Sequence, residues 1–202
     1  MPIEQIKIGF DNFSYIIYCS KTSKAAIVDP GYDVLNLLEF LSSNKLRLEY
    51  IIATHYHNDH IACINKIKYS NPESKIISSE SDGTELGIKV DILVKDDDEL
   101  KIGDVNFKFI LTPGHTTGGI CIIVDNEALL TGDTLFIGDC GRTDLPGGSL
   151  AQMFKTLQEK IIPLPDHLIV YPGHDYGVKP FDTLGKLKPD LLILIEEIRK
   201  SL

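Results

Sequence analysis

Thr54-His55-Tyr56-His57-Asn58-Asp59-His60 carries three histidines and one aspartate, directly after the apolar run Tyr50-Ile51-Ile52-Ala53. A strand that ends at residue 53 would deliver four candidate metal ligands on one tight loop. His55 and His57 are spaced i, i+2 and can point the same way, whereas the adjacent Asp59 and His60 must point elsewhere. This division suggests two metal ions rather than one. Neutral imidazoles with a carboxylate suit zinc, iron or manganese.

Three later loops share one feature with this stretch, because each follows an apolar run and carries one ligand-type residue beside a glycine. They are Thr112-Pro113-Gly114-His115-Thr116-Thr117-Gly118-Gly119, Thr131-Gly132-Asp133-Thr134 and Tyr171-Pro172-Gly173-His174-Asp175-Tyr176-Gly177. Glycine beside a ligand lets the backbone approach a metal closely or adopt a positive φ. His115, Asp133 and His174 therefore join the first cluster, which gives seven candidate ligands.

Seven ligands are the number that two bridged metal ions need. One ion would be held by His55, His57 and His115, and the other by Asp59, His60 and His174. Asp133 has two carboxylate oxygens and would bridge the ions, which then lie ~3.5–4 Å apart and share a hydroxide that is nucleophilic at neutral pH. The sequence predicts two divalent metal ions, with zinc first and iron or manganese as alternatives. Asp59 and Asp133 thus enter the catalytic set as metal ligands, not as free general bases.

Hydrophobic periodicity predicts two successive sets of strands and helices. Strand-like runs lie at 6–10, 13–18, 25–28, 50–53, 76–77, 91–94, 100–102, 107–111, 120–124, 128–130 and 167–171. Helical spacing is found at 34–41, 61–67, 150–161, with Ser149 as N-cap, and 191–198. This order predicts an α/β (α+β) chain with one domain over 1–202, in which two mainly antiparallel sheets pack face to face with helices outside. Such a fold gathers strand-end loops along one edge.

The composition limits the classes of partner. A chain of 202 residues, 43% of them hydrophobic, can bury ample core, and its net charge of -9 argues against a nucleic-acid or anionic-membrane partner. No run approaches the ~20 apolar residues of a membrane span, and residues 1–5 lack the features of a signal peptide. The expected partner is a small-molecule substrate, and the expected state is a monomer or homodimer.

The four cysteines indicate a reducing compartment. They are scattered and form no Cys-x-x-Cys pair, which is typical of reduced cytosolic thiols rather than of a disulfide framework. Cys19, Cys63 and Cys121 lie in apolar runs and are expected in the core, and no catalytic role is assigned to Cys140. The predicted localisation is cytoplasmic.

The pattern His-x-His-x-Asp-His, followed by separate His, Asp and His loops, resembles the metallo-β-lactamase superfamily. Five spaced elements match in order over about 29–174. The resemblance implies the αββα sandwich, and aspartate rather than cysteine at position 133 is similar to the hydrolase branches: glyoxalase II, lactonases and tRNA-processing nucleases. It also implies that Asp29 orients a ligand histidine. The alternative for Asp29 is a turn residue in Asp29-Pro30-Gly31.

The stretch 132–144 narrows this resemblance. Its Gly-Asp-Thr-Leu-Phe and Cys-Gly-Arg segments are similar to glyoxalase II and to the persulfide dioxygenases, and Gly-His-Asp-Tyr-Gly at 173–177 also occurs in short glyoxalase II-like proteins. Glutathione-binding versions carry tyrosine two residues after the position of Arg142, where this chain has Asp144. Arg142 is a candidate for contact with a substrate anion, or else a salt-bridged structural residue. Tyr176 either lines the substrate pocket or packs under the His174 loop.

The main functional hypothesis is a binuclear hydrolase that directs a metal-bridging hydroxide at a thioester, similar to the hydroxyacylglutathione hydrolases. A thiolate leaves without a strong general acid because a thiol has a low pKa. A second hypothesis is a mononuclear iron persulfide dioxygenase, in which His55 or its neighbour, His115 and Asp133 would form a two-His-one-carboxylate triad. A lactonase is a further alternative, since esters and thioesters undergo the same hydroxide attack. The acidity and short length of the chain disfavour an RNA-processing member.

Overall fold

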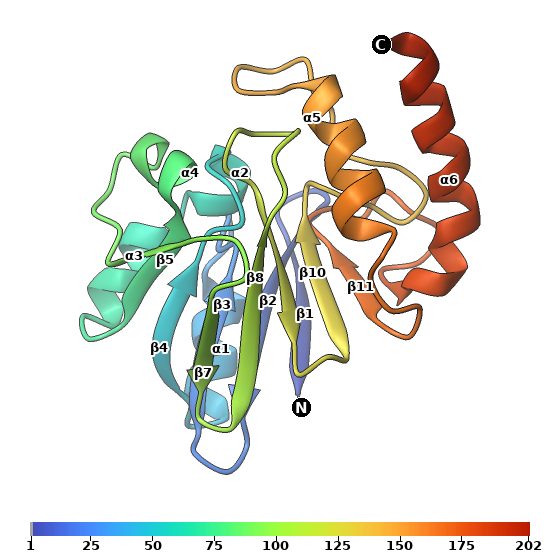
Figure 1. The fold of residues 1–202 in the computed structure, drawn as a ribbon. Coiled ribbons are helices and arrows are strands. Elements are labelled where there is room, and N and C mark those ends of the chain that lie inside the picture. The colour runs from blue at the N-terminus through green and yellow to red at the C-terminus, as the bar shows by residue number, and fades with distance from the viewer. Residues whose placement is uncertain (1) are drawn as a thin grey trace.

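Two six-stranded sheets pack face to face in the computed structural model, which describes residues 2–202, and helices lie outside them (Figure 1). The first sheet has the order β1-β2-β3-β4-β5-β6, with β1 (Ile3–Ile8), β2 (Asn12–Cys19), β3 (Lys24–Val28), β4 (Arg47–Ile52), β5 (Lys75–Ser79) and β6 (Ile92–Val94). The second has the order β12-β11-β10-β9-β8-β7, with β7 (Glu99–Ile102), β8 (Val105–Leu111), β9 (Ile120–Val124), β10 (Ala128–Gly132), β11 (Ile169–Pro172) and β12 (Asp182–Thr183). The predicted αββα sandwich is confirmed.

The helices divide between the two outer faces of this sandwich. The first sheet is accompanied by α1 (Leu35–Ser43), α2 (Asn58–Ile61), α3 (Ile64–Ser70) and α4 (Glu80–Glu85). The second is covered by α5 (Leu150–Lys155), which continues as a π-helical segment over Thr156–Ile161, and by α6 (Leu184–Ser201) (Figure 1). Ser149 caps α5 as predicted, because its side chain accepts a hydrogen bond from the backbone N–H of Gln152.

The pairing within the first sheet differs from the mainly antiparallel arrangement that the sequence predicts. Its β1–β2 and β2–β3 pairs are antiparallel, but β3–β4, β4–β5 and β5–β6 are parallel. Parallel neighbours need a crossover connection, and helices α1 to α4 supply these between successive strands. The second sheet is mainly antiparallel, since β10–β11 is its one parallel pair among the described residues.

Apolar side chains fill three layers of this arrangement. Strand alternation sends Phe107 and Phe109 of β8 into the core between the sheets, while Ile110 joins the cluster beneath α5 and α6. In the same way Ile17 of β2 faces the second sheet and Ile16 faces the helices on the other side. Burial on both faces explains why most of β2 is an apolar run, whereas β8 has the polar residues Asn106 and Lys108 at its less buried positions.

Three helical predictions need correction. The interval 74–124 is not all strand, because it contains α4, whose Glu-Ser-Asp-Gly-Thr-Glu sequence has no apolar period to reveal it. The single helix expected at 61–67 is two short helices, α2 and α3. The final helix begins at Leu184 rather than Leu191. Buried residues recur at helical spacing on both sides of the internal Pro189, a residue type that usually ends a helix. Strand β12 was also not predicted.

Strand direction explains why the chemically active loops meet. The C-terminal ends of β3 and β4 lie at one edge of the first sheet because these strands are parallel. In the second sheet β8, β10 and β11 run in the same direction, so the loops after them also share an edge. Strand β2 is antiparallel to β3, which brings its first residue, Asn12, to that edge as well. An isolated bridge between Asn12 and His174 joins the two sheets there.

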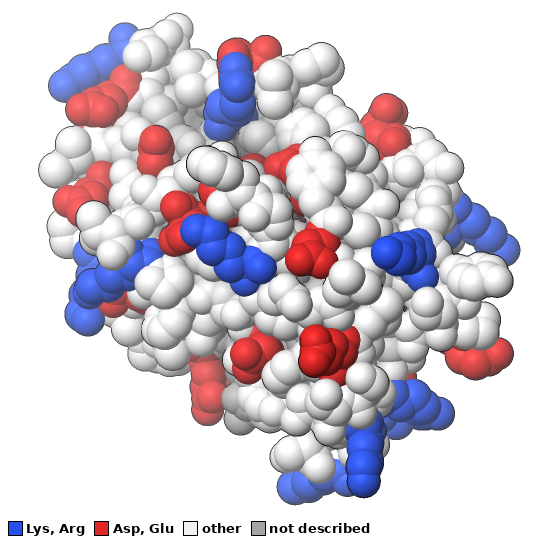
Figure 2. Space-filling view, turned by 180° about the vertical axis from the view of Figure 1, so that it is seen from behind, with Lys and Arg blue, Asp and Glu red and all other residues white. Residues whose placement is uncertain are grey.

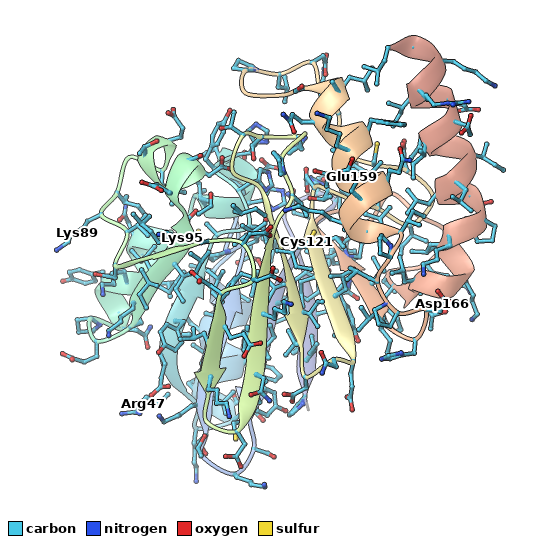
Figure 3. The ribbon with its side chains drawn as sticks, viewed as in Figure 1. Arg47, Lys89, Lys95, Cys121, Glu159 and Asp166 are labelled. Atoms are coloured by element: carbon cyan, nitrogen blue, oxygen red, sulfur yellow. The ribbon has the colours of Figure 1, made fainter. Side chains whose placement is uncertain are left out.

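The cysteine prediction is confirmed for the three apolar-run residues. Cys19, Cys63 and Cys121 are buried, Cys140 is half-buried, and all four are free thiols. In Figure 3 Cys121 lies among the strands of the second sheet, whereas Arg47 and Lys89 reach out at the periphery of the molecule. The thiols that the sequence assigns to packing are therefore in the core.

The described part of the chain contains no helix that is long and apolar enough to cross a membrane. On the face shown in Figure 2, lysine and arginine side chains are interspersed with aspartate and glutamate and do not merge into one basic patch. This mixed surface agrees with the net charge of -9.

Candidate metal centre

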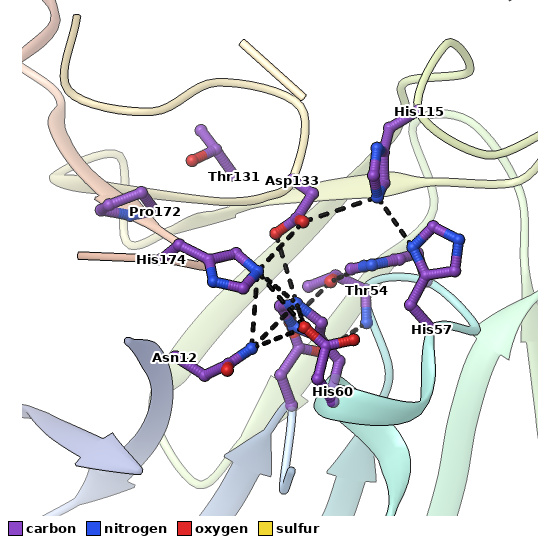
Figure 4. A network of polar contacts seen from close by, with 12 residues as sticks. Asn12, Thr54, His57, His60, His115, Thr131, Asp133, Pro172 and His174 are labelled. Atoms are coloured by element: carbon purple, nitrogen blue, oxygen red, sulfur yellow. Dashed lines mark hydrogen bonds and ion pairs between the residues drawn. The ribbon is translucent and has the colours of Figure 1, made fainter. Parts of the chain in front are cut away.

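All seven predicted metal ligands come together where the loops at the C-terminal ends of β4, β8, β10 and β11 meet (Figure 4). The loop after β4 and helix α2 contribute four of them, and the loops after β8, β10 and β11 contribute one each. The donor atoms fall into two groups of three, each with all its donors within 4.8 Å of one another: His55, His57 and His115 in one group, and Asp59, His60 and His174 in the other. We call these the HHH group and the DHH group. The structure thus brings together the two sets of side chains expected from sequence spacing, and a third set of close donors, Asp29, His55 and His60, spans both.

Asp133 lies between the two groups. Its Oδ2 is 3.5 Å from His115 Nε2 and 3.2 Å from His174 Nε2, and its Oδ1 is 3.3 Å from His60 Nε2. A carboxylate that reaches donors on both sides has the geometry expected of a bridging ligand. The close-up shows Asp133 between His174 and His115, with His60 below it (Figure 4).

Two buried polar atoms without hydrogen-bond partners indicate that a cation binds among these side chains. His55 Nε2 and Asp133 Oδ1 are buried and have no hydrogen-bond partner among the described residues. Buried polar atoms are normally paired, so an unpaired nitrogen and an unpaired carboxylate oxygen in one site call for an electrophilic partner. The backbone is also shaped to the ligands, since a Cβ at Gly173 would overlap Asp133 Oδ1 and stand 2.9 Å from His60 Cε1. The imidazole and carboxylate donors fit zinc, iron or manganese.

Charge in the metal-free site is balanced by protons on histidine. Burial lowers the pKa of His60, but the Asp133 and Asp29 carboxylates more than offset this and raise it to about 8. Burial likewise lowers the pKa of His174, and Asp133 and Asp59 raise it to about 10. Burial lowers the pKa of His55, which stays neutral. The DHH group therefore carries protons at neutral pH that a metal ion must displace.

Metal binding is expected to release protons near pH 7. A raised pKa means that His60 and His174 are protonated below about 8 and about 10, so metal affinity should fall as the pH drops. Zinc titration by calorimetry at pH 7, in buffers with different ionisation enthalpies, should show net release of at least one proton per chain. Release should be smaller at pH 9, where His60 is already neutral. Buffer-independent heats at both pH values would contradict this expectation.

Asp29 lies behind the ligands and contacts both groups of the centre. Its Oδ1 accepts a hydrogen bond from the backbone N–H of Thr54 at 2.7 Å, and its Oδ2 accepts from Thr54 Oγ1 at 2.6 Å. His60 Nδ1 donates to the same Oδ2 at 3.0 Å, while Thr54 Oγ1 is 3.1 Å from His55 Nδ1. These contacts leave the Nε2 atoms of both histidines facing the centre. The alternative role predicted for Asp29, as a turn residue only, does not account for the contacts.

Asn12 is a polar residue of the centre that the sequence did not reveal. Its Nδ2 donates to Asp59 Oδ2 at 2.8 Å and lies 3.4 Å from both His60 Nε2 and His174 Nε2. The backbone on either side is bonded to the His174 loop, since Phe13 N–H donates to Gly173 O and Asp175 N–H donates to Asp11 O. The signal that could have found Asn12 is its position as the first residue of β2, directly after the turn that joins β1 to β2.

Arg142 and Tyr176 lie at the margin of the centre. The Arg142 guanidinium is exposed and forms two hydrogen bonds of 2.7 Å with the Asp144 carboxylate, while its backbone oxygen accepts from His115 Nδ1 at 2.7 Å. The Tyr176 ring stacks on the His174 ring with centroids 4.7 Å apart and planes at 11°. The Tyr176 ring also contacts Phe136, with centroids 5.0 Å apart, and remains more than half exposed, so part of it is accessible next to a predicted ligand. Burial raises the pKa of Cys140 to about 12, so this thiol stays protonated.

The family follows from the comparison with known sequences. A model of the metallo-beta-lactamase superfamily matches residues 9–174. The chain belongs to the metallo-β-lactamase superfamily. The superfamily and its curated relatives are consistent with the resemblance to the glyoxalase II-like branch that the motifs indicated.

Two relatives and one solved structure illustrate what the chain is similar to. It is 32% identical over 187 residues to the probable polyketide biosynthesis zinc-dependent hydrolase PksB of Bacillus subtilis (strain 168), covering 92% of this chain and 83% of PksB. It is 34% identical over 187 residues to the hydroxyacylglutathione hydrolase of Francisella tularensis subsp. novicida (strain U112), covering 92% of this chain and 69% of that relative. The crystal structure of ETHE1 from Myxococcus xanthus matches with a TM-score of 0.87 and 26% identity, over 97% and 85% of the two chains. The chain is thus a hydrolase-type member of the superfamily with a His/Asp metal site.

Proposed function

We propose that this chain hydrolyses thioesters of small hydroxyacyl groups, with one divalent metal ion held by the HHH group, a second by the DHH group, and Asp133 shared between them. The observation that carries this proposal is the pair of three-donor groups on either side of one carboxylate. The hydroxyacylglutathione hydrolase relative supports the substrate class, because its named substrate is a thioester. The zinc-dependent PksB relative supports zinc as the metal.

Metal ions bound in the two groups would supply an activated hydroxide and a Lewis acid that polarises the substrate carbonyl. The residues of the chain orient these groups. Asp29 holds His60 with its Nε2 toward the centre, and the Arg142 backbone oxygen does the same for His115. Asn12 directs the Asp59 carboxylate. The departing thiolate is a stable anion, so the centre needs no buried general acid for it.

The margin of the centre bears on the thiol carrier. Arg142 is the cation placed beside the His115 loop, but Asp144 occupies its guanidinium through two hydrogen bonds. This pairing cancels the charge that would attract a carboxylate of glutathione. The exposed part of the Tyr176 ring offers an apolar surface next to His174. We therefore propose a thiol carrier other than glutathione.

A mononuclear iron persulfide dioxygenase is the second candidate. The similarity of the fold to ETHE1 is compatible with it, and His55, His115 and Asp133 include the residue types of a two-His-one-carboxylate triad. The named hydrolases among the relatives weigh against it. A lactonase uses the same hydroxide attack as a thioesterase and stays as a third alternative.

Metal analysis of the purified chain combined with three substrates separates these candidates. The proposed function predicts two metal ions per chain and turnover of a hydroxyacyl thioester under argon, at a higher kcat/KM than for a lactone. One iron per chain, with oxygen uptake in the presence of a persulfide and no thioester turnover, would overturn the proposal in favour of the dioxygenase. Faster turnover of the lactone would reassign the substrate class.

A further inference from the structure

Asp82 is a fully buried carboxylate for which the proposed reaction has no use. It lies in α4, outside all seven predicted ligands, and its side chain points at the loop that carries His115. Its Oδ2 accepts a hydrogen bond from Thr116 Oγ1 at 2.6 Å, and its Oδ1 accepts from the backbone N–H of Gly118 at 2.6 Å. The two donors follow His115 directly in the chain. The carboxylate thus grips the loop of one metal ligand.

The loop is shaped for this contact. A Cβ at Gly118 would stand 2.6 Å from Asp82 Oδ1 and would also overlap the Ser79 side chain, so glycine is required for the loop to approach α4. On its other side a Cβ at Gly114 would stand 2.6 Å from Met153 of α5. The His115 loop is therefore packed between α4 and α5, and Asp82 supplies its polar contacts with α4.

The loop that Asp82 holds contacts the other loop of the HHH group. His115 Nε2 lies 2.8 Å from His57 Nδ1, and the backbone N–H of Ile120 donates to Thr54 O at 2.9 Å. Burial raises the pKa of Asp82, although the hydrogen bonds from Thr116 and Gly118 oppose this. A carboxylate that fixes the His115 loop therefore acts next to the other two HHH ligands.

The Asp82 carboxylate is bonded to a loop of the HHH group, whose three donors include no carboxylate. The HHH donors are three imidazoles, whereas the DHH group contains the Asp59 carboxylate and has Asp29 bonded to His60. Among the described residues no ion pair links Asp82 to a lysine or arginine. Because the carboxylate is bonded to the loop of His115, its ionised form would stabilise a cation bound by the HHH group.

We propose that Asp82 is a positioning residue for the HHH group, fixing the His115 loop against the His55–His57 loop and supplying the buried negative charge of that half of the centre. This inference rests on the proposed two-metal centre and adds a residue that supports metal binding in only one of its two halves. Its consequence is selectivity: loss of Asp82 should weaken metal binding at the HHH group and spare the DHH group.

Zinc titration of the full chain tests the inference without any substrate. The chain as it stands should bind two zinc ions. Asp82→Asn keeps the size of the side chain but removes its charge, and should weaken one of the two binding steps about 10- to 100-fold while leaving the other unchanged. Combining it with His174→Ala, which disables the DHH group, should preserve the effect, and combining it with His57→Ala should remove it. Asp91→Asn is the matched control, because Asp91 also accepts a backbone hydrogen bond, from Ile76 at 2.9 Å, far from the centre.

A second variant guards against misfolding. Thr116→Val removes one of the two donors to Asp82 with little change of shape and should weaken the same binding step by a smaller factor. The inference is overturned if Asp82→Asn and Thr116→Val both bind two zinc ions with the affinities of the unaltered chain, or if both binding steps weaken equally. Failure of the unaltered chain to bind zinc would instead overturn the proposed metal centre and the inference with it.

Discussion

Asp133→Asn is expected to lower kcat/KM for a hydroxyacyl thioester by about 10³-fold or more. Asp133 approaches donors of both groups, so no other residue can hold the two halves together. Asparagine has one oxygen in place of two and no charge, and it leaves a buried amide N–H₂ toward a cation. Several kcal/mol of transition-state stabilisation depend on correctly held metal ions, and each 1.4 kcal/mol or so is a factor of ten in rate.

Metal content and steady-state kinetics of the same preparation check this expectation. Bound zinc should fall from two ions per chain to one or fewer, while the thermal unfolding temperature of the metal-free protein changes little. Asp139→Asn is the matched control, because Asp139 lies in the same loop, is exposed, and bonds only to the backbone N–H of Cys140. An Asp133→Asn variant with two zinc ions and full activity would refute the assignment of this residue as the shared ligand.

The predicted ligands could be found from the sequence because their chemistry is rare and their positions are regular. Histidines and aspartates stand at the ends of apolar strands, where alternation and strand length leave little freedom about which edge they reach. The split into HHH and DHH groups followed from spacing within a single loop. The sandwich followed from the order of strands and helices.

The supporting residues could not be found in the same way. Asn12 is the first residue of β2, directly after a turn, and Asp82 belongs to a short helix without apolar periodicity. Each acquires its role only when tertiary packing brings it against a loop far along the chain, at separations of 47 residues for Asn12 and Asp59 and 34 for Asp82 and Thr116. The parallel pairing of β3 with β4, which brings Asp29 beside Thr54, was not predicted either, although the crossover helix between these strands was. The crossover helix α4, between β5 and β6, was not predicted.

Asp29→Asn is expected to weaken metal binding at the DHH group about 10- to 100-fold, with a loss of about 2–3 kcal/mol in the free energy of unfolding. Asparagine suits the backbone here, because residue 29 has φ of 51° and asparagine tolerates that region. The amide oxygen must face the backbone N–H of Thr54, which can only donate. The amide nitrogen then takes the place of Oδ2, opposite Thr54 Oγ1 and His60 Nδ1.

The two neighbours of this nitrogen respond differently. The Thr54 hydroxyl can rotate and accept from the amide while it still accepts from His55 Nδ1, 3.1 Å away, so His55 keeps its Nε2 free for a metal ion. His60 Nδ1 must lose its proton to accept from the amide, which transfers that proton to Nε2, the atom that faces Asp133 and His174. An Nε2–H cannot bind a metal ion, so the DHH group should lose its ligand while the HHH group is spared.

Nitrogen-15 spectra of the histidine rings and zinc titration distinguish this tautomer exchange from general damage. In the metal-free chain at pH 9, where the His60 ring is neutral, His60 should change from the Nδ1–H form to the Nε2–H form in Asp29→Asn, and only one of the two zinc-binding steps should weaken. Asp125→Asn is the matched control, because Asp125 also has positive φ, at 50°, and accepts a backbone hydrogen bond, from Asn106 at 2.8 Å, away from the centre. Unchanged histidine tautomers in Asp29→Asn would mean that Asp29 supports the turn alone. If Asp29→Asn changes the His60 tautomer and weakens one zinc-binding step, and Asp82→Asn weakens the other step, then separate carboxylates position the two halves of the centre.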